Sequence, residues 1–262
     1  AIQEGVPGVA GIHIEGPFIN ELRKGAHDST KIRDLDARDM ALLSSLQLGR
    51  TMVTLAPEMT PLATIRHLAN EGVVISAGHT NGTFDEVSEA LRNGVTGITH
   101  LFNAMSPFGH REPGAAGAAL ADPACWCGII VDGHHVHPAA LRIALACKGH
   151  QRFMLVTDAM ANVGTGMTSF MLQGRRILVE DGRCVDESGV LTGSALDMAS
   201  AVRNAVAMLG VPLEEAARMA STNPARFLGL GGELGRIAPG HRASLVALGA
   251  DFSVTRTWID GE

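Results

Sequence analysis

Four short apolar runs decide the fold of this 262-residue chain: GIHIEG at residues 11–16, VVISAGH at 73–79, GITHLFN at 97–103 and MLVTDAM at 154–160. Each run carries a polar side chain at or near its end, in chain order Glu15, His79, His100 and Asp158. A ligand set of two His and one Glu leaves one coordination position open on Zn²⁺, which is typical of catalytic rather than structural zinc sites. The pattern therefore predicts a metal-dependent hydrolase.

Strand-like and helix-like segments alternate through the first 160 residues. Apolar, β-branched runs begin near residues 9, 51, 73, 97, 127 and 153. A helical segment follows most of these runs, as βα units require. Residues 61–72 and 138–149 each begin at Pro and end at Gly, and Thr83 with Glu86 forms a capping box for a third helix. We expect an α/β fold, a TIM-like (β/α)8 barrel with six of its eight parallel strands in this sequence.

The pattern changes after the last of the four runs. Residues 173–194 contain Asp-Gly and Ser-Gly turn signals between short strand-like segments, and a long helical stretch covers residues 197–228. The tail, residues 234–262, returns to short alternating strands that cannot join a parallel sheet without crossover helices. We expect a metal-dependent hydrolase barrel over residues 1–235 and part of a small β-sandwich domain over residues 236–262.

Composition excludes several classes of function. The formal net charge is -6, and the sequence lacks the clustered basic residues by which proteins bind nucleic acids or anionic membranes. It has no run of about 20 apolar residues that would span a membrane, and its start lacks a signal-peptide pattern. Four irregularly spaced cysteines do not form a disulfide framework. We expect a cytoplasmic protein with reduced cysteines that binds neither nucleic acid nor membrane.

The polar residues at the strand ends can meet although they are far apart in sequence. Side chains alternate along a strand, so His13 and Glu15 share one face. In an α/β barrel the carboxyl ends of the strands converge on the catalytic face. We expect Glu15, His79 and His100 to be metal ligands, with His13 as a supporting or packing residue.

A second group of ligand-type residues allows two interpretations. Asp132, His134, His135 and His137 stand immediately before Pro138. They could form a second metal site, but polar residues are also common at the start of a helix. We favour one functional histidine in this group over a metal cluster.

A longer series of motifs carries a family resemblance. In chain order they are HIEGPF at 13–18, KGAH at 24–27, SAGHTNG at 76–82, THLFNAM at 99–105, HREPG at 110–114, VDGHHVHP at 131–138, LVTDAM at 155–160, LTGSALDM at 191–198 and STNPARFLGL at 221–230. Together they resemble the N-acetylglucosamine-6-phosphate deacetylases of the amidohydrolase superfamily. The resemblance implies hydrolysis of N-acetyl-D-glucosamine 6-phosphate to D-glucosamine 6-phosphate and acetate in amino-sugar catabolism, with metal-activated water and an Asp acid–base residue.

The resemblance also implies roles for individual residues. The ligand pattern of the family falls on the strand-end triad, and its essential acid falls on Asp158. Its substrate contacts fall on eight residues: Ala26, Asn103, Ala104, Arg111, His135, Thr192, Gly193 and Ser194. The implied cofactor is a divalent metal, with Zn²⁺ preferred, and the presence of a second ion is left open. A homodimer is implied because the phosphate-binding Arg of the family can come from the neighbouring subunit.

One departure from the family leaves two further interpretations open. Members of the family have a segment before the EGP strand that holds two barrel strands and half of the small β-domain, whereas Glu15 is preceded by 14 residues here. We therefore expect this sequence to be part of a longer protein. Alternatives are another amidohydrolase activity, on a cyclic amide or an N-acyl amino acid, and an inactive fragment. Only the deacetylase needs Arg111 as a phosphate anchor.

Overall fold

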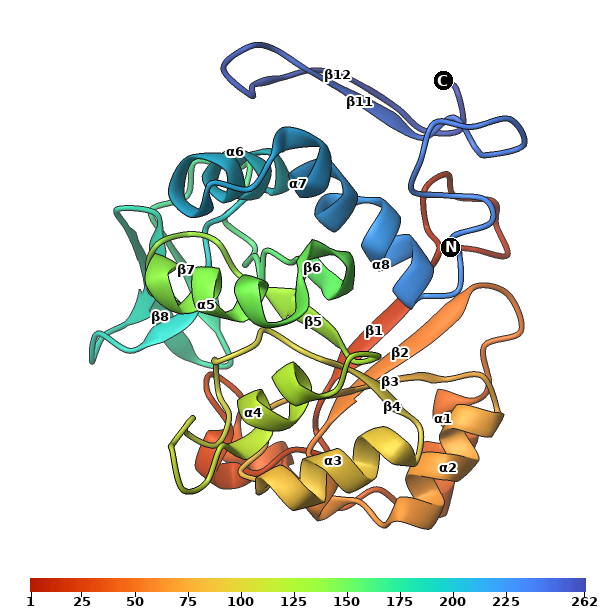
Figure 1. Cartoon of the computed structure of the whole chain (residues 1–262), viewed down its shortest axis with the longest axis vertical. Helices are drawn as coiled ribbons and strands as arrows, with labels where there is room; N and C mark the ends of the chain where they lie inside the picture. The colour runs from red at the N-terminus through yellow and green to blue at the C-terminus, as the bar shows by residue number, and fades with distance from the viewer.

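The computed structural model describes residues 1–262 and contains a six-stranded parallel sheet with the strand order β1-β2-β3-β4-β5-β6 (Figure 1). The strands are β1 (Gly11–Glu15), β2 (Arg50–Leu55), β3 (Val74–Ala77), β4 (Val95–Ile98), β5 (Trp126–Ile129) and β6 (Phe153–Leu155). All six agree with the expected runs, and the sheet is the curled part of an α/β barrel. β1 and β6 do not pair with each other, so the sheet does not close.

The core explains why these strands have apolar sequences. Val53, Leu55, Ile75 and Ile129 are completely buried, because helices cover the outer face of the sheet while the inner face lies inside the curl. Strands buried on both faces are expected to have nearly continuous apolar sequences rather than alternating ones. Each such side chain contributes about 1.5–3 kcal/mol by leaving water. The core therefore fixes the positions of the strand ends.

Helices follow the strands of the sheet with the expected end signals. They are α1 (Ala37–Leu43), α2 (Leu62–Asn70), α3 (Phe84–Arg92), α4 (Gly114–Ala121) and α5 (Pro138–Lys148). The capping box of α3 is present, since the Thr83 side chain accepts from the backbone N–H of Glu86 and the Glu86 side chain accepts from that of Thr83. Short 3-10 helices, Glu21–Arg23, Ser29–Lys31, Pro57–Met59 and His150–Arg152, lie in the connections.

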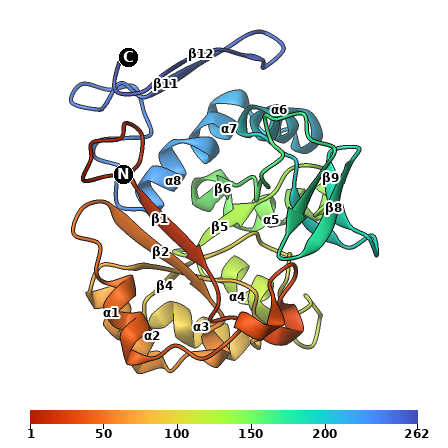
Figure 2. The same cartoon turned by 180° about the vertical axis from the view of Figure 1, so that it is seen from behind.

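The expected long helical stretch over residues 197–228 is three helices: α6 (Met198–Leu209), α7 (Leu213–Ala220) and α8 (Thr222–Phe227). α6 ends at Gly210, whose φ of 71° is left-handed, and Pro212 then begins the next helix. Ser221 separates α7 from α8. Figures 1 and 2 show these helices on the side of the molecule opposite α1, α2 and α3, with the sheet between them.

Two small antiparallel sheets lie outside the barrel. β7 (Ser169–Leu172), β8 (Arg175–Glu180), β9 (Arg183–Asp186) and β10 (Leu191–Ser194) form a four-stranded sheet beside the carboxyl ends of the barrel strands (Figure 2). β11 (Leu245–Leu248) and β12 (Val254–Trp258) form a separate hairpin near the chain ends (Figure 1). That this hairpin is part of a β-sandwich domain stays a prediction. None of the helices has both the length and the apolar character that crossing a membrane requires.

Candidate metal centre and cavity

A cavity of about 470 Å³ lies at the carboxyl ends of the barrel strands. Glu15 from β1, His79 after β3, His100 after β4 and Asp158 after β6 all line it. Residues separated by up to 143 positions therefore share one site, because parallel strands bring their carboxyl ends to the same edge of the sheet.

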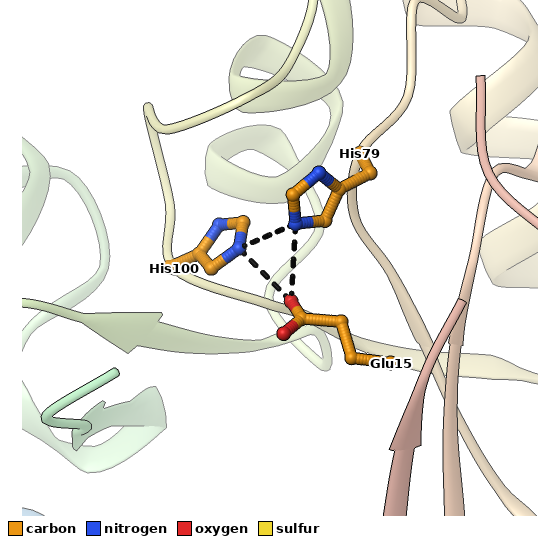
Figure 3. A group of neighbouring side chains, drawn as sticks. All are labelled: Glu15, His79 and His100. Atoms are coloured by element: carbon orange, nitrogen blue, oxygen red, sulfur yellow. Dashed lines mark hydrogen bonds and ion pairs between the residues drawn. The ribbon is translucent and has the colours of Figure 1, made fainter. Parts of the chain in front are cut away.

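Three of these side chains point their polar atoms at one another (Figure 3). Glu15 Oε1 lies 3.0 Å from His100 Nε2 and 3.2 Å from His79 Nε2, and the two Nε2 atoms are 3.1 Å apart. The two imidazoles are almost completely buried. Glu15, His79 and His100 are the one group of three or more His, Cys, Asp or Glu residues in the structure whose ligand atoms all lie within 4.8 Å of one another.

The hydrogen bonds of His79 indicate that this group fits a cation. His79 Nδ1 lies 2.8 Å from the backbone carbonyl of Arg23, which can only accept, so Nδ1 carries the proton. In the neutral ring Nε2 then presents a lone pair to a Glu15 oxygen that also only accepts, and in the absence of a cation only the doubly protonated ring can donate to that oxygen. A divalent cation between these atoms would replace this repulsion by coordination, and the bond to Arg23 would hold the imidazole in the required tautomer.

The charges in the site influence one another. Burial alone raises the pKa of Glu15, but hydrogen bonds from His100 and His79 outweigh burial and leave the pKa lowered. Burial alone lowers the pKa of His100, but Glu15 and Asp158 outweigh it and leave the pKa raised. Burial raises the pKa of Asp158. The site therefore pairs an ionised carboxylate beside the imidazoles with a second carboxyl that takes up a proton more readily.

The backbone is left-handed at three of the four strand-end residues. The φ angles are 48° at His79, 34° at His100 and 50° at Asp158. Few residues other than Gly adopt this region, although Asn, Asp and His do so more often than the rest; such conformations cost about 1–3 kcal/mol each and concentrate at functional sites. The fold retains this strain at the positions where the polar side chains turn into the cavity.

The backbone around Asp158 is held by the end of β10. Ser194 Oγ donates to the carbonyl of Thr157, and the N–H of Ser194 donates to the carbonyl of Asp158 at 2.8 Å. Gly193 has a φ of 69°, and a Cβ there would lie 2.6 Å from the side chain of Met160. The close contact between these two segments therefore needs glycine and fixes the position of the Asp158 carboxyl.

Comparison with known proteins agrees with this geometry. The amidohydrolase family matches residues 1–262. The chain belongs to the amidohydrolase family. It is 42% identical over 262 residues to an N-acetylgalactosamine-6-phosphate deacetylase from Shewanella sp. (strain ANA-3), covering 100% of this chain and 66% of the relative.

Further relatives of this amidohydrolase are also longer than the chain itself. An N-acetylglucosamine-6-phosphate deacetylase from Vibrio furnissii is 39% identical over 264 residues, covering 98% of this chain and 65% of the relative. A mutant N-acetyl-D-glucosamine-6-phosphate deacetylase from Mycobacterium smegmatis, solved in complex with N-acetyl-D-glucosamine-6-phosphate, is 40% identical with a TM-score of 0.88, covering 96% of this chain and 68% of that one. The amidohydrolase chain therefore spans about two thirds of the length of these proteins.

Five of the eight expected substrate contacts of the amidohydrolase line the cavity, and three do not. Ala26, Asn103, Ala104, His135 and Gly193 line the cavity. Thr192 and Ser194 are buried behind the wall, where Ser194 contacts the backbone around Asp158 instead. The Asn103 side chain donates to the carbonyls of His100 and Leu101, at 3.2 and 3.3 Å.

Arg111 lies outside the cavity of its own chain. Its side chain is exposed and forms no ion pair, and the neighbouring Glu112 accepts hydrogen bonds from the backbone N–H groups of Phe84 and Gly114 instead. Arg111 and Glu112 therefore form no salt bridge with each other. The position leaves the guanidinium free to reach another molecule.

The residues before α5 do not form a second metal cluster. His135 bonds to Asp132, whereas His137 accepts the backbone N–H of Ala139 and so caps α5. His134 is exposed. Only His135 from this group faces the cavity, and that it is functional stays a prediction.

The sequence did not indicate several other residues of the cavity wall. His27 packs edge-on against His79, with ring centroids 4.7 Å apart, and burial lowers the pKa of His27. Arg23 lines the cavity and donates to Asn81 at 2.9 Å. Gln173, between β7 and β8, also lines the cavity. Only His27 had a signal, since it ends the KGAH motif, whereas Gln173 lies in a turn without a pattern of its own.

Proposed function

We propose that this amidohydrolase removes the acetyl group from N-acetyl-D-glucosamine 6-phosphate, giving D-glucosamine 6-phosphate and acetate, with one divalent ion held by Glu15, His79 and His100. The meeting of these residues with Asp158 at one cavity carries the proposal. Zn²⁺ is the preferred ion, because imidazole and carboxylate ligands with an open position suit it. A cytoplasmic homodimer completes the proposal.

The metal, when bound, supplies a Lewis acid that makes water reactive near neutral pH and polarises the amide carbonyl. Asp158 accepts the proton of the attacking water and later delivers a proton to the leaving amine. Its burial supports this exchange, since a raised pKa makes the carboxylate a stronger base and brings its pKa closer to neutral pH, where it can both take up and return a proton. His135 faces the same cavity, and its hydrogen bond to Asp132 fixes the ring beside the bound substrate.

The phosphate of the substrate needs a separate anchor. Arg111 offers a planar set of donors that matches phosphate. Because Arg111 lies outside its own cavity and is exposed, we assign it to the cavity of a second copy of this chain. The backbone of Ala26 and the turn at Asn103 and Ala104 hold the sugar ring between the metal centre and the phosphate anchor.

A second candidate substrate is N-acetyl-D-galactosamine 6-phosphate. The relatives from Shewanella sp. and from Escherichia coli O157:H7 are named for this substrate and are 42% and 40% identical to the chain. The two sugars differ only in the orientation of one ring hydroxyl, so the same metal, acid and phosphate contacts serve both.

Acetate release from both phosphorylated sugars by the zinc-loaded protein tests the function, with Asp158→Asn as the matched variant. We expect release from at least one sugar and a fall in kcat of about 1,000-fold in the variant, since the proton transfers of one carboxyl contribute up to about 10⁴-fold. The ratio of kcat/KM values for the two sugars decides between the candidates. Absence of release from both, in protein that binds zinc, would reject the proposal.

A further inference from the structure

Glu58 does not line the cavity, but it contacts three residues that adjoin the cavity wall. It belongs to the short 3-10 helix Pro57–Met59 that follows β2. Its Oε1 atom accepts the side-chain amide of Asn20 at 3.0 Å and the backbone N–H of Asn81 at 2.6 Å. Its Oε2 atom accepts the hydroxyl of Thr80, which is completely buried. One carboxylate therefore joins the loop after β1 to the turn after β3.

The loop after β1 carries the hydrogen-bond acceptor of a proposed metal ligand. Asn20 Oδ1 accepts the backbone N–H of Leu22 at 2.9 Å and so caps the 3-10 helix that ends at Arg23. The Asn20 Nδ2 group donates to Glu58, and this contact fixes the way the amide faces. The backbone carbonyl of Arg23 lies 2.8 Å from His79 Nδ1. Glu58 thus reaches His79 through Asn20 and the helix that Asn20 caps.

A second set of contacts also connects Glu58 to Arg23. The bond from the Asn81 N–H to Glu58 holds the turn after β3, and the Asn81 side chain accepts Arg23 Nε at 2.9 Å. The backbone N–H of Asn20 donates to the carbonyl of His79 at 2.9 Å. The same loop therefore holds His79 both at its backbone and at its ring.

The position of the Arg23 carbonyl matters for the orientation of the imidazole. The ring of His79 turns Nε2 toward Glu15 and His100 and Nδ1 away from them (Figure 3). The carbonyl keeps the proton on Nδ1 and the ring in this orientation. The loop packs closely on the same ring, since a Cβ at Gly25 would lie 3.3 Å from His79 Cε1. A shift of the loop by about 1 Å would break the bond, because N–H···O bonds are made over about 2.7–3.2 Å.

We propose that Glu58 is a positioning residue of the metal centre: it holds the Arg23 carbonyl against Nδ1 of His79 and so keeps Nε2 turned toward Glu15 and His100. This inference rests on the proposed function for the presence of the ion and for nothing else. Glu58 acts only through other residues, so its loss should weaken metal binding while the ligands themselves remain.

The first experiment measures zinc affinity by competition with a chromophoric chelator. Glu58→Ala should weaken zinc binding by about 10- to 100-fold, as is typical when an outer hydrogen-bond partner of a metal-binding histidine is lost. Glu86→Ala is the matched control, because Glu86 also accepts a backbone N–H and a hydroxyl, both of Thr83, but has no connection to His79. Its zinc affinity should stay within about twofold of the wild type.

The outcomes separate this inference from the proposed function. Wild-type zinc affinity in a folded Glu58→Ala protein would overturn the positioning role, and so would an equal loss in Glu58→Ala and Glu86→Ala, which would show a general effect on stability. Absence of zinc binding by the wild type would reject the proposed ion site and this inference together.

The second experiment follows the ring proton on Nδ1 of His79 in zinc-loaded protein labelled with ¹⁵N-histidine. A proton bonded to a carbonyl beside a buried ring should exchange slowly with water, and Glu58→Ala should speed its exchange by about tenfold or more. Glu58→Gln should keep the slow exchange, since its oxygen can still accept from Asn20 and Asn81 while its NH₂ group donates to Thr80. Unchanged exchange in Glu58→Ala would contradict the proposal.

Asn20→Ala provides a further test if Glu58→Ala does not fold. It leaves Glu58 joined to Thr80 and Asn81 and removes the cap of the helix that ends at Arg23. Zinc binding should weaken by about three- to tenfold, as the loss of one hydrogen bond predicts. Wild-type zinc affinity in this variant would overturn the proposal.

Discussion

The two sides of the cavity are built in different ways. Glu15, His79, His100 and Asp158 follow directly from strands whose apolar residues are buried in the core. The opposite rim comes from connections: the residues around Ala26, and the turn between β7 and β8. The strand side therefore has little freedom, while the rim depends on a few contacts between loops. We infer that the strand side determines the reaction and the rim determines the substrate.

The largest effect is expected on the strand side, from Glu15→Gln. The change removes the anionic ligand, so zinc should no longer stabilise the fold, whereas zinc at 100 times its Kd should stabilise the wild type by about 2.7 kcal/mol. Thermal unfolding with and without zinc measures the difference. The exposed Glu21 provides the control variant Glu21→Gln. Zinc stabilisation that survives in Glu15→Gln would contradict the proposed ligand set.

The next largest effect is expected from Arg111→Met. Loss of a charge-assisted contact should lower kcat/KM for the phosphorylated sugar by about 10- to 100-fold, corresponding to about 1.5–3 kcal/mol, and should leave the unphosphorylated sugar nearly unaffected. The exposed helical Arg66 gives the control Arg66→Met. An equal loss on both sugars would favour an amidohydrolase that does not recognise phosphate.

Mixing two impaired variants sharpens this result. If Arg111 serves the partner's cavity, a dimer of one Arg111→Met subunit and one Asp158→Asn subunit contains one intact site. Acetate release should therefore reappear when the two variants are refolded or expressed together. No recovery in mixed dimers would place Arg111 in its own subunit's site.

A smaller effect is expected at the rim, from Arg175→Met. Arg175, the first residue of β8, donates to the carbonyl of Ala26 and so joins this strand to the loop after β1 that lines the cavity. Without this bond, KM should rise by about three- to tenfold with little change in kcat, because one net hydrogen bond contributes about 0.5–1.5 kcal/mol. Arg176→Met is the matched control, since Arg176 reaches only Ser169, at 3.5 Å. A fall in kcat alone would contradict a role of this contact in binding.

The smallest effect concerns stability away from the cavity. Arg33 donates to both carboxylate oxygens of Asp39, and this contact lowers the pKa of Asp39 to about 2. A folded-state pKa below the unfolded value of about 3.9 stabilises the fold above about pH 4, and this contribution is lost as the pH falls toward 2. Asp39→Asn should therefore cost about 1 kcal/mol at pH 7 and almost nothing at pH 2.

Denaturant unfolding across this pH range measures the cost, with the exposed Asp34→Asn as control. A cost that does not depend on pH would mean that the ion pair contributes nothing and that the helix end is stabilised by packing.

The sequence predicted the strand side of the site far better than the rim. Glu15, His79 and His100 follow apolar runs, and parallel strands leave one arrangement for their ends. The contact of Arg175 with Ala26 joins residues 149 positions apart, one at the start of β8 and the other in an irregular connection, and no periodic pattern predicts such a pair. The helical stretch expected over residues 197–228 is divided into three helices, and Gly210 and Pro212 lie at the first division.

The left-handed backbone at His79, His100 and Asp158 affects which amino-acid substitutions this protein tolerates there. Glycine and asparagine tolerate that conformation, and either would also remove a titratable group from the interior. A mutant library sorted only for folded, heat-resistant molecules should lose its original residues first at these three positions. A library sorted for acetate release should keep them. The difference between the two libraries would outline the reactive centre without any ligand.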